Sequence, residues 1–149
     1  MDAPIAMPRY VILLHEVPAG QAVSGGRGTH WDLMLEQDGR LRTWALATEP
    51  AGELSTRAEQ LSDHRIAYLE YEGPVSGNRG SVRRWEAGEY ELLAESPSRI
   101  DICLQSAGRQ RFLSLVADGS PTAAEQPAHF WIASFSFAPI RGPSSSSSS

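Results

Sequence analysis

THWDLMLEQDGRLRTWAL, residues 29–46, is the stretch of this sequence that decides the fold class. Two runs in which apolar and polar residues alternate stand on either side of Asp38-Gly39, a dipeptide that favours the tight turn of a β-hairpin. Successive residues of a strand point to opposite faces, so one face of this hairpin can pack while the other carries polar groups. The stretch therefore predicts two antiparallel strands at the centre of a β-sheet.

Similar short alternating runs cover most of the chain. A helical pattern occurs only over residues 55–63, with Ser55 or Thr56 as its cap. About nine strands at this spacing predict a mainly β fold, either an antiparallel barrel or a sandwich. Of the two we expect a compact antiparallel β-barrel with one or two short helices. Besides the central hairpin, we expect strands at 9–14, 66–72, 81–85, 90–93, 99–104, 111–116 and 129–137.

The length of 149 residues suits one domain. We expect a flexible N-terminal tail over 1–8, the barrel domain over 9–138 and a disordered serine-rich tail over 139–149. Two long loops, 16–28 and 119–128, are of the kind that often carries function.

Composition excludes several classes of protein. The chain has no apolar run near 18 residues and no signal-peptide pattern, so a membrane span and secretion are not expected. One cysteine, Cys103, fits a reducing compartment, and we expect a cytoplasmic monomer. The net charge of −5 argues against nonspecific nucleic-acid binding, although all 13 basic residues are arginine, the better bidentate partner of phosphate.

The polar face of the first hairpin strand is unusual. His30 and Asp32 lie two residues apart and therefore point the same way. A carboxylate beside an imidazole is costly to bury unless something binds it, so this face either lines a wet cleft or holds a metal. Further histidines stand at the expected ends of strands, His15 and His64. Imidazoles and carboxylates are ligands of divalent manganese, iron and zinc.

Several ordered blocks resemble the 3′-phosphoesterase module of bacterial ATP-dependent DNA ligase D. That family has a strand that ends in histidine, a His-aromatic-Asp-x-Arg-Leu-Glu strand, an Asp-Gly turn and a Ser-Trp-Ala-Val strand. Its later blocks are His-Pro-x-x-Tyr-x-x-Phe-Glu-Gly and Gly-Thr-Val-x-x-Trp-Asp-x-Gly-x-Tyr-Glu. The matching blocks here are RYVILLH, HWDLMLEQDGRLRTWAL, HRIAYLEYEG and RGSVRRWEAGEYELL, from Arg9 to about Leu93.

The resemblance implies a site and an activity. The family's metal ligands fall on His15, His30 and Asp32, its second catalytic histidine on His64, and the tyrosine near the phosphate on Tyr68. It implies a compact β-barrel that depends on a divalent metal, chiefly Mn²⁺ with Zn²⁺ or Fe²⁺ as other options, and that trims 3′-phosphates and 3′-terminal ribonucleotides. The implied partners are DNA 3′ ends or primer-template junctions, with DNA ligase or other end-joining proteins as further candidates.

Two departures from the family pattern concern phosphate recognition. Met34 stands where the family has arginine, and a thioether cannot make the charged, forked contact of a guanidinium with phosphate. Thr48 stands where the family has lysine. Arg83 and Arg84 alternate in facing, so only one of them can point inward. We expect Arg83 to be the inward one and to act in catalysis, with Arg27 in the glycine-rich loop as a second substitute.

Two other functions stay open at this stage. A noncatalytic relative could keep the barrel and serve as a metal-binding or DNA-end-binding module. Alternatively, His30, Asp32 and a distal His129 resemble the facial triad of iron oxygenases, with Arg141 as a carboxylate-binding residue. The second alternative leaves the ligase-like blocks unexplained.

Overall fold

The central hairpin forms as expected from its turn residues. The computed structural model describes residues 7–18, 28–75, 80–118 and 129–138. Strands β2 (His30–Gln37) and β3 (Arg40–Leu46) pair antiparallel around Asp38 and Gly39, whose φ angles are 54° and 79°. Positive φ at both central residues is the type I′ hairpin turn, a conformation that aspartate and glycine tolerate.

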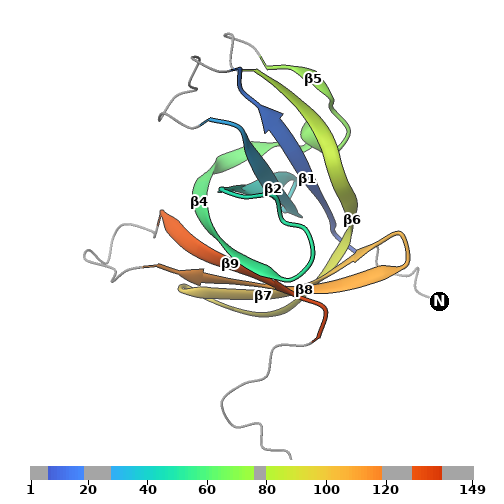
Figure 1. The fold of residues 1–149 in the computed structure, drawn as a ribbon. Coiled ribbons are helices and arrows are strands. Elements are labelled where there is room, and N and C mark those ends of the chain that lie inside the picture. The colour runs from blue at the N-terminus through green and yellow to red at the C-terminus, as the bar shows by residue number, and fades with distance from the viewer. Residues whose placement is uncertain (1–6, 19–27, 76–79, 119–128, 139–149) are drawn as a thin grey trace, which may run out of the picture.

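Antiparallel pairing continues around a closed ring, so the expected β-barrel is confirmed. Within the described residues, eight strands follow one another in the order β1-β2-β3-β4-β9-β8-β7-β6, and β6 pairs back with β1 (Figure 1). Closure leaves no unpaired edge on these strands. The bounds of the other strands are β1 Arg9–Glu16, β4 Leu54–Arg65, β6 Ser81–Ser96, β7 Arg99–Ser106, β8 Arg109–Ala117 and β9 Phe130–Ser136.

The predicted helix over 55–63 is wrong, because this segment lies within β4. Thr56 and Ala58 are buried while Arg57 between them is exposed, which is the period of a strand. Small and polar residues at the inward positions hide this alternation in the sequence. The β structure is imposed by the neighbours, since β4 pairs with β3 on one side and with β9 on the other.

The predicted strand over 66–72 is also wrong. Its first half is a 3₁₀ helix, η1 (Ile66–Leu69), and the two-residue strand β5 (Gly73–Pro74) follows it. Among the described residues, η1 is therefore the short helix that accompanies the strands. The two strands expected at 81–85 and 90–93 form one long strand, β6, which continues through Gly88.

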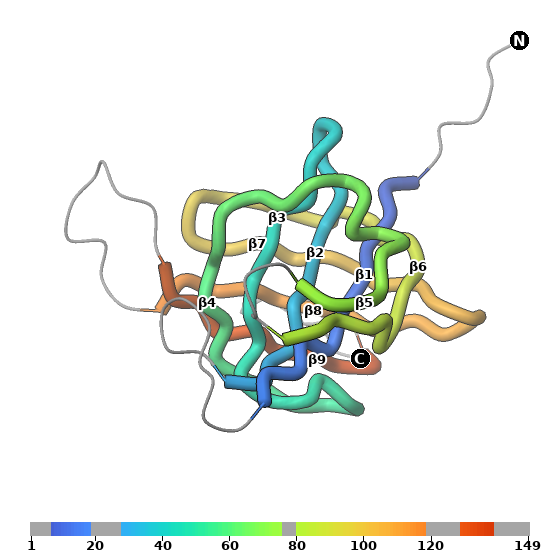
Figure 2. Tube along the Cα trace, turned by 90° about the horizontal axis from the view of Figure 1, so that it is seen from above, coloured from blue at the N-terminus to red at the C-terminus, as the bar shows by residue number. Residues whose placement is uncertain are grey.

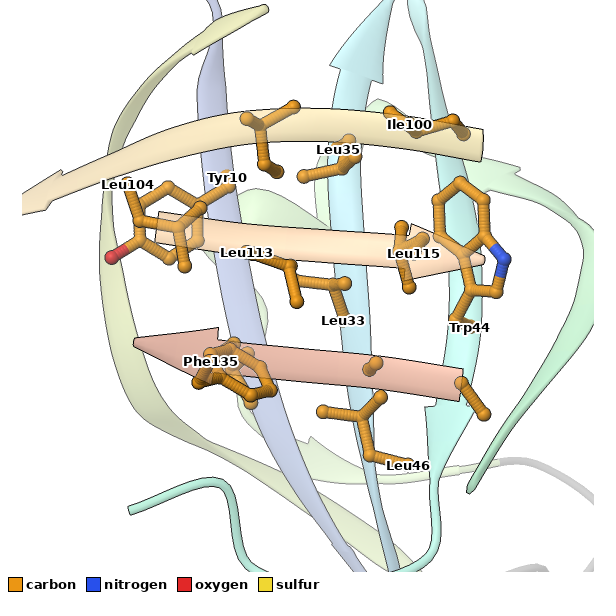
Figure 3. Close-up of a cluster of buried hydrophobic side chains, with 14 of the residues drawn as sticks. Tyr10, Leu33, Leu35, Trp44, Leu46, Ile100, Leu104, Leu113, Leu115 and Phe135 are labelled. Atoms are coloured by element: carbon orange, nitrogen blue, oxygen red, sulfur yellow. The ribbon is translucent and has the colours of Figure 1, made fainter. Parts of the chain in front are cut away.

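The interior of the barrel is filled by apolar side chains from both halves of the ring. Strands β1–β3 cross β7–β9 at a steep angle, and their inward side chains meet between them (Figure 3). Trp44 is fully buried and meets Trp131 edge to face, with ring centroids 6.1 Å apart. This interior core includes Tyr10, Ile12, Leu33, Leu35, Leu46, Ile102, Leu104, Leu113, Leu115 and Phe135.

A second, smaller apolar cluster lies on the outer face of β1–β3. We call it the outer cluster, and it includes Leu69 of η1, which contacts β1 and β3. Figure 2 shows the chain between β4 and β5 passing over the outside of β1–β3. Its buried members are Val11, Leu13, Met34, Leu41, Leu69 and Val82. Strands β1 and β2 are thus covered on both faces, which explains why their sequences are nearly continuous in apolar residues.

Some expectations lie outside the described residues. These are the two tails, 1–6 and 139–149, and most of the two long loops, 19–27 and 119–128. None of the described helices is both long enough and apolar enough to span a bilayer.

Gly88 offers a test of the close approach between β6 and β7. A Cβ atom at this position would collide with the backbone carbonyl oxygen of Gln105. We expect Gly88→Ala to lower the free energy of unfolding by about 1–3 kcal/mol, the usual cost of overpacking. Gly28→Ala is the matched control, because nothing lies within 4 Å of its added Cβ. Urea denaturation followed by tryptophan fluorescence measures both, and equal stabilities would contradict this account of β6.

Candidate metal centre and its surroundings

Strand register brings the first histidine and the polar face of β2 together. β1 and β2 are antiparallel neighbours, and His15 lies directly opposite His30. Asp32, two residues after His30, points to the same face and lies opposite Leu13. Residues 15 positions apart in the chain therefore meet because the register of one strand pair places them there.

The three side chains of His15, His30 and Asp32 converge. One donor atom from each of them lies within 4.8 Å of the other two. His30 Nε2 is 3.1 Å from Asp32 Oδ1, and His15 Nδ1 is 3.4 Å from Asp32 Oδ2. Donor atoms at these separations can share one ion, since metal–ligand bonds are about 2.0–2.2 Å long.

The carboxylate at the centre is buried and ionised. Asp32 is 4% exposed and His30 is 5% exposed. Burial alone raises the pKa of Asp32, but its contacts with His15 and His30 outweigh burial and hold the pKa at about 2. At neutral pH the centre therefore carries a negative charge that is enclosed between two imidazoles.

Two details of hydrogen bonding fit a cation at this position. His30 Nδ1 donates a hydrogen bond to the carbonyl oxygen of Gly28 at 2.7 Å, which orients the ring so that Nε2 is turned toward Asp32. Asp32 Oδ1 is buried, yet it accepts no well-directed hydrogen bond from any described residue. The donor set of two imidazoles and one carboxylate suits manganese, iron or zinc.

His64 and Tyr68 form a separate pair. Their ring centroids are 5.6 Å apart, with His64 at the end of β4 and Tyr68 in η1. In the strand register His64 lies opposite Leu41, which lies opposite Glu36 on β2. Four residues on a strand separate that position from Asp32, roughly 13 Å along the strand direction. The two groups share the outer face but are not in contact.

Met34 occupies the space between these two groups. It lies on the face of Asp32, as expected, but it is 1% exposed and packs within the outer cluster. Leu69 of η1 belongs to the same cluster, so apolar side chains close this part of the surface.

Arg84, rather than Arg83, is on the face of the metal centre, so the expected facing of Arg83 is wrong. β6 pairs with β1 so that Val82 lies opposite His15 and Arg83 opposite Leu14. Arg83 therefore points to the opposite face, where its Nε lies 3.7 Å from Glu16. A register shift between Ile12 and Leu13, which sequence reasoning cannot locate, sets this facing.

The guanidinium of Arg84 is held by the protein backbone. Its Nη2 donates a hydrogen bond to the carbonyl oxygen of Leu69 at 3.1 Å. Thr48, at the place of the family's lysine, donates a hydrogen bond to the hydroxyl of Thr56 at 2.6 Å. Arg27 lies outside the described residues.

The alternative set of ligands for an iron oxygenase does not assemble. Among the described residues, the histidine that joins His30 and Asp32 is His15, whereas His129 lies outside this cluster, just before β9. Arg141 lies outside the described residues.

Sequence reasoning missed two features beside the centre. One is the carbonyl of Gly28, which orients His30. The other is a hollow next to His30 that Arg57 and Phe130 help to line. Because residues 55–63 read as a helix, the position of Arg57 on the same sheet face as Asp32 could not be inferred.

Comparison with known proteins gives two matches. Residues 21–122 match the family model described as the DNA ligase D 3′-phosphoesterase domain, a range that contains His30, Asp32, His64 and Tyr68. The multifunctional non-homologous end joining protein LigD of Pseudomonas aeruginosa is 32% identical over 69 residues. That alignment covers 43% of this chain and 8% of the LigD protein.

Met34 offers a test of the closed surface between the two polar groups. Met34→Arg would bury a charge in the outer cluster without a partner, so we expect a loss of about 3 kcal/mol or more in the free energy of unfolding. Met34→Leu keeps an apolar side chain of similar volume and should cost less than about 1.5 kcal/mol. Urea denaturation compares the two variants. An arginine variant as stable as the leucine variant would show that this surface opens easily.

Proposed function

The chain belongs to the DNA ligase D 3′-phosphoesterase domain family, and on this basis we propose that it is a divalent-metal-dependent phosphoesterase that acts on DNA 3′ ends. The observation that carries the proposal is the convergence of His15, His30 and Asp32 within 4.8 Å. Structural packing alone does not require a buried carboxylate between two imidazoles. An end-joining context follows from the relative's name, as part of the same proposal.

The three residues would hold the metal through His15, His30 Nε2 and the Asp32 carboxylate. Mn²⁺ is the ion we expect, with Zn²⁺ or Fe²⁺ as alternatives that the same ligands accept. When bound, such an ion activates a water molecule and polarises a phosphoryl oxygen. Three protein ligands leave coordination positions for water and substrate, as catalytic sites require.

Removal of a 3′-phosphate has a simple balance of atoms. A bond forms between phosphorus and the oxygen of water, the bond from phosphorus to O3′ breaks, and O3′ takes one proton to leave as a hydroxyl. In our proposal the DNA end lies across Met34, so that His64 supplies that proton or stabilises the transferring group, and Tyr68 orients it. His64 Nδ1 donates to the carbonyl oxygen of Ser62 at 3.0 Å, which leaves Nε2 available for this role.

One observation favours a second candidate, a binding module without catalysis. Met34 closes the surface between the metal centre and His64, where the family pattern has an arginine. Loss of such a charged contact with the transition state commonly costs a hundredfold or more in rate, about 10²–10³, if nothing replaces it. The two candidates share the metal centre and differ only in turnover.

A duplex with a 3′-phosphate on a 5′-labelled strand tests the proposal directly. We expect the wild-type chain to convert the 3′-phosphate to a 3′-hydroxyl with Mn²⁺ and not with a chelator, as measured by a shift in gel mobility. Asp32→Asn keeps the shape but removes the charge, so Mn²⁺ affinity measured by calorimetry should fall by about tenfold or more.

The outcomes separate the two candidates. Metal-dependent turnover supports the phosphoesterase. Metal-dependent binding of the 3′-phosphate end without turnover supports the binding module. Full Mn²⁺ affinity in Asp32→Asn would exclude this centre as the metal site.

His64 provides a separate test of the proton-transfer role. His64→Ala should lower turnover by about a hundredfold or more if the side chain moves a proton or stabilises charge at the reacting phosphate. Mn²⁺ affinity should stay unchanged, because His64 lies outside the three-residue cluster. If the turnover of His64→Ala is within threefold of wild type, His64 does not transfer a proton or stabilise charge in the reaction.

A further inference from the structure

A hollow of about 310 Å³ opens beside His30, on the side away from the outer cluster. This volume lies at the lower end of the range of about 300–1,000 Å³ for pockets that hold small ligands. The hollow adjoins the candidate metal centre because His30 belongs to both. The residues around it include His30, Ala45, Ala47, Arg57, Glu59 and Phe130.

Strand register explains why Arg57 faces this hollow. Asp32 lies opposite Ala45, Ala45 opposite Glu59, and Glu59 opposite Phe130, so one row on the outer face crosses four strands. Arg57 is two residues before Glu59 on β4 and therefore shares its face. Ala45 carries only a methyl group between Asp32 and Glu59, and it lines the hollow.

The guanidinium of Arg57 is held in place without a counter-ion. Its Cζ lies 4.9 Å from the centroid of the Phe130 ring, a cation–π contact. Among the described residues no carboxylate pairs with it, and both Arg57 and Phe130 are exposed. An oriented, accessible guanidinium can make the forked contact that phosphate oxygens accept.

Arg57 supplies the guanidinium that lines this hollow. It is the arginine among the described residues around the hollow, and Glu59 is the acid there. A phosphate placed beside the candidate metal centre can therefore pair with the Arg57 guanidinium.

We propose that this hollow receives the 3′-terminal nucleotide of the DNA and that Arg57 pairs with its terminal phosphate beside the metal centre. This inference rests on the proposed function. It assigns to Arg57 the charged contact with phosphate that Met34 cannot make. The small side chains of Ala45 and Ala47 leave the space, and Phe130 keeps Arg57 pointed into it.

Binding and turnover of the full chain test the inference. The binding probe is a fluorescent DNA duplex that ends in a 3′-methylenephosphonate, whose carbon–phosphorus bond is not hydrolysed, compared with the same duplex ending in a 3′-hydroxyl. Anisotropy titrations are run with Mn²⁺ and with a chelator. Turnover is measured separately on the 3′-phosphate duplex, and Mn²⁺ affinity by calorimetry.

We expect Arg57→Gln to weaken binding of the phosphonate end by about tenfold or more and to change binding of the hydroxyl end little. Mn²⁺ affinity should be unchanged, because Arg57 is not a ligand. Arg57→Lys should recover part of the loss, and Phe130→Leu should weaken binding by about threefold. Arg42→Gln is the matched control, because Arg42 also stacks on an aromatic ring, Trp44 at 5.3 Å, but pairs with Glu95 away from the hollow.

Failure of this inference and failure of the proposed function look different. If wild type cleaves the 3′-phosphate and Arg57→Gln matches Arg42→Gln in both binding and turnover, the role of Arg57 is overturned while the phosphoesterase stands. If wild type does not cleave but distinguishes the two ends through Arg57, the binding role is supported and catalysis is overturned. A wild-type chain that neither cleaves nor distinguishes the ends overturns both.

Discussion

The buried carboxylate of Asp32 is the constraint on which the site depends. A charge at 4% exposure is costly unless positive or hydrogen-donating groups surround it, and here two imidazoles do so. These imidazoles in turn need fixed positions. The pairing of β1 with β2 fixes the backbone positions of His15 and His30, and the carbonyl of Gly28 orients the ring of His30. Whatever binds at this centre is therefore met by donors that are already arranged.

Strands β1 and β2 serve the interior core and the functional face at the same time. Leu33 points into the barrel, while Asp32 and Met34 point outward. Because the side-chain period of a strand is two, a slip of one residue would exchange these faces. The interior core thus holds the register, and the register places the metal centre. Closure of the barrel also holds this register, since β6 pairs with β1 along the whole length of β1.

The outer face is divided into a closed side and an open side. On the closed side, Met34 lies between the candidate metal centre and the pair of His64 and Tyr68, and Leu69 of η1 packs in the same cluster as Met34. On the open side, alanine residues and the stacked pair of Arg57 and Phe130 border the hollow beside His30. This division distinguishes the chain from the pattern of its family, in which an arginine occupies the position of Met34.

The sequence by itself determined the strand-rich fold and the central hairpin with its turn, because alternation and turn chemistry are local properties. It also placed His30 and Asp32 on one face. Sequence reasoning predicted a helix where β4 forms and a strand where η1 forms. The structure of both segments depends on neighbours distant in the chain. Only the tertiary structure decided that Arg84 and not Arg83 shares the face of the centre, that Met34 is sealed, and that Arg57 borders the open hollow. Pairing register and bulges fix these facings, and both arise from contacts between strands rather than from any short stretch of sequence.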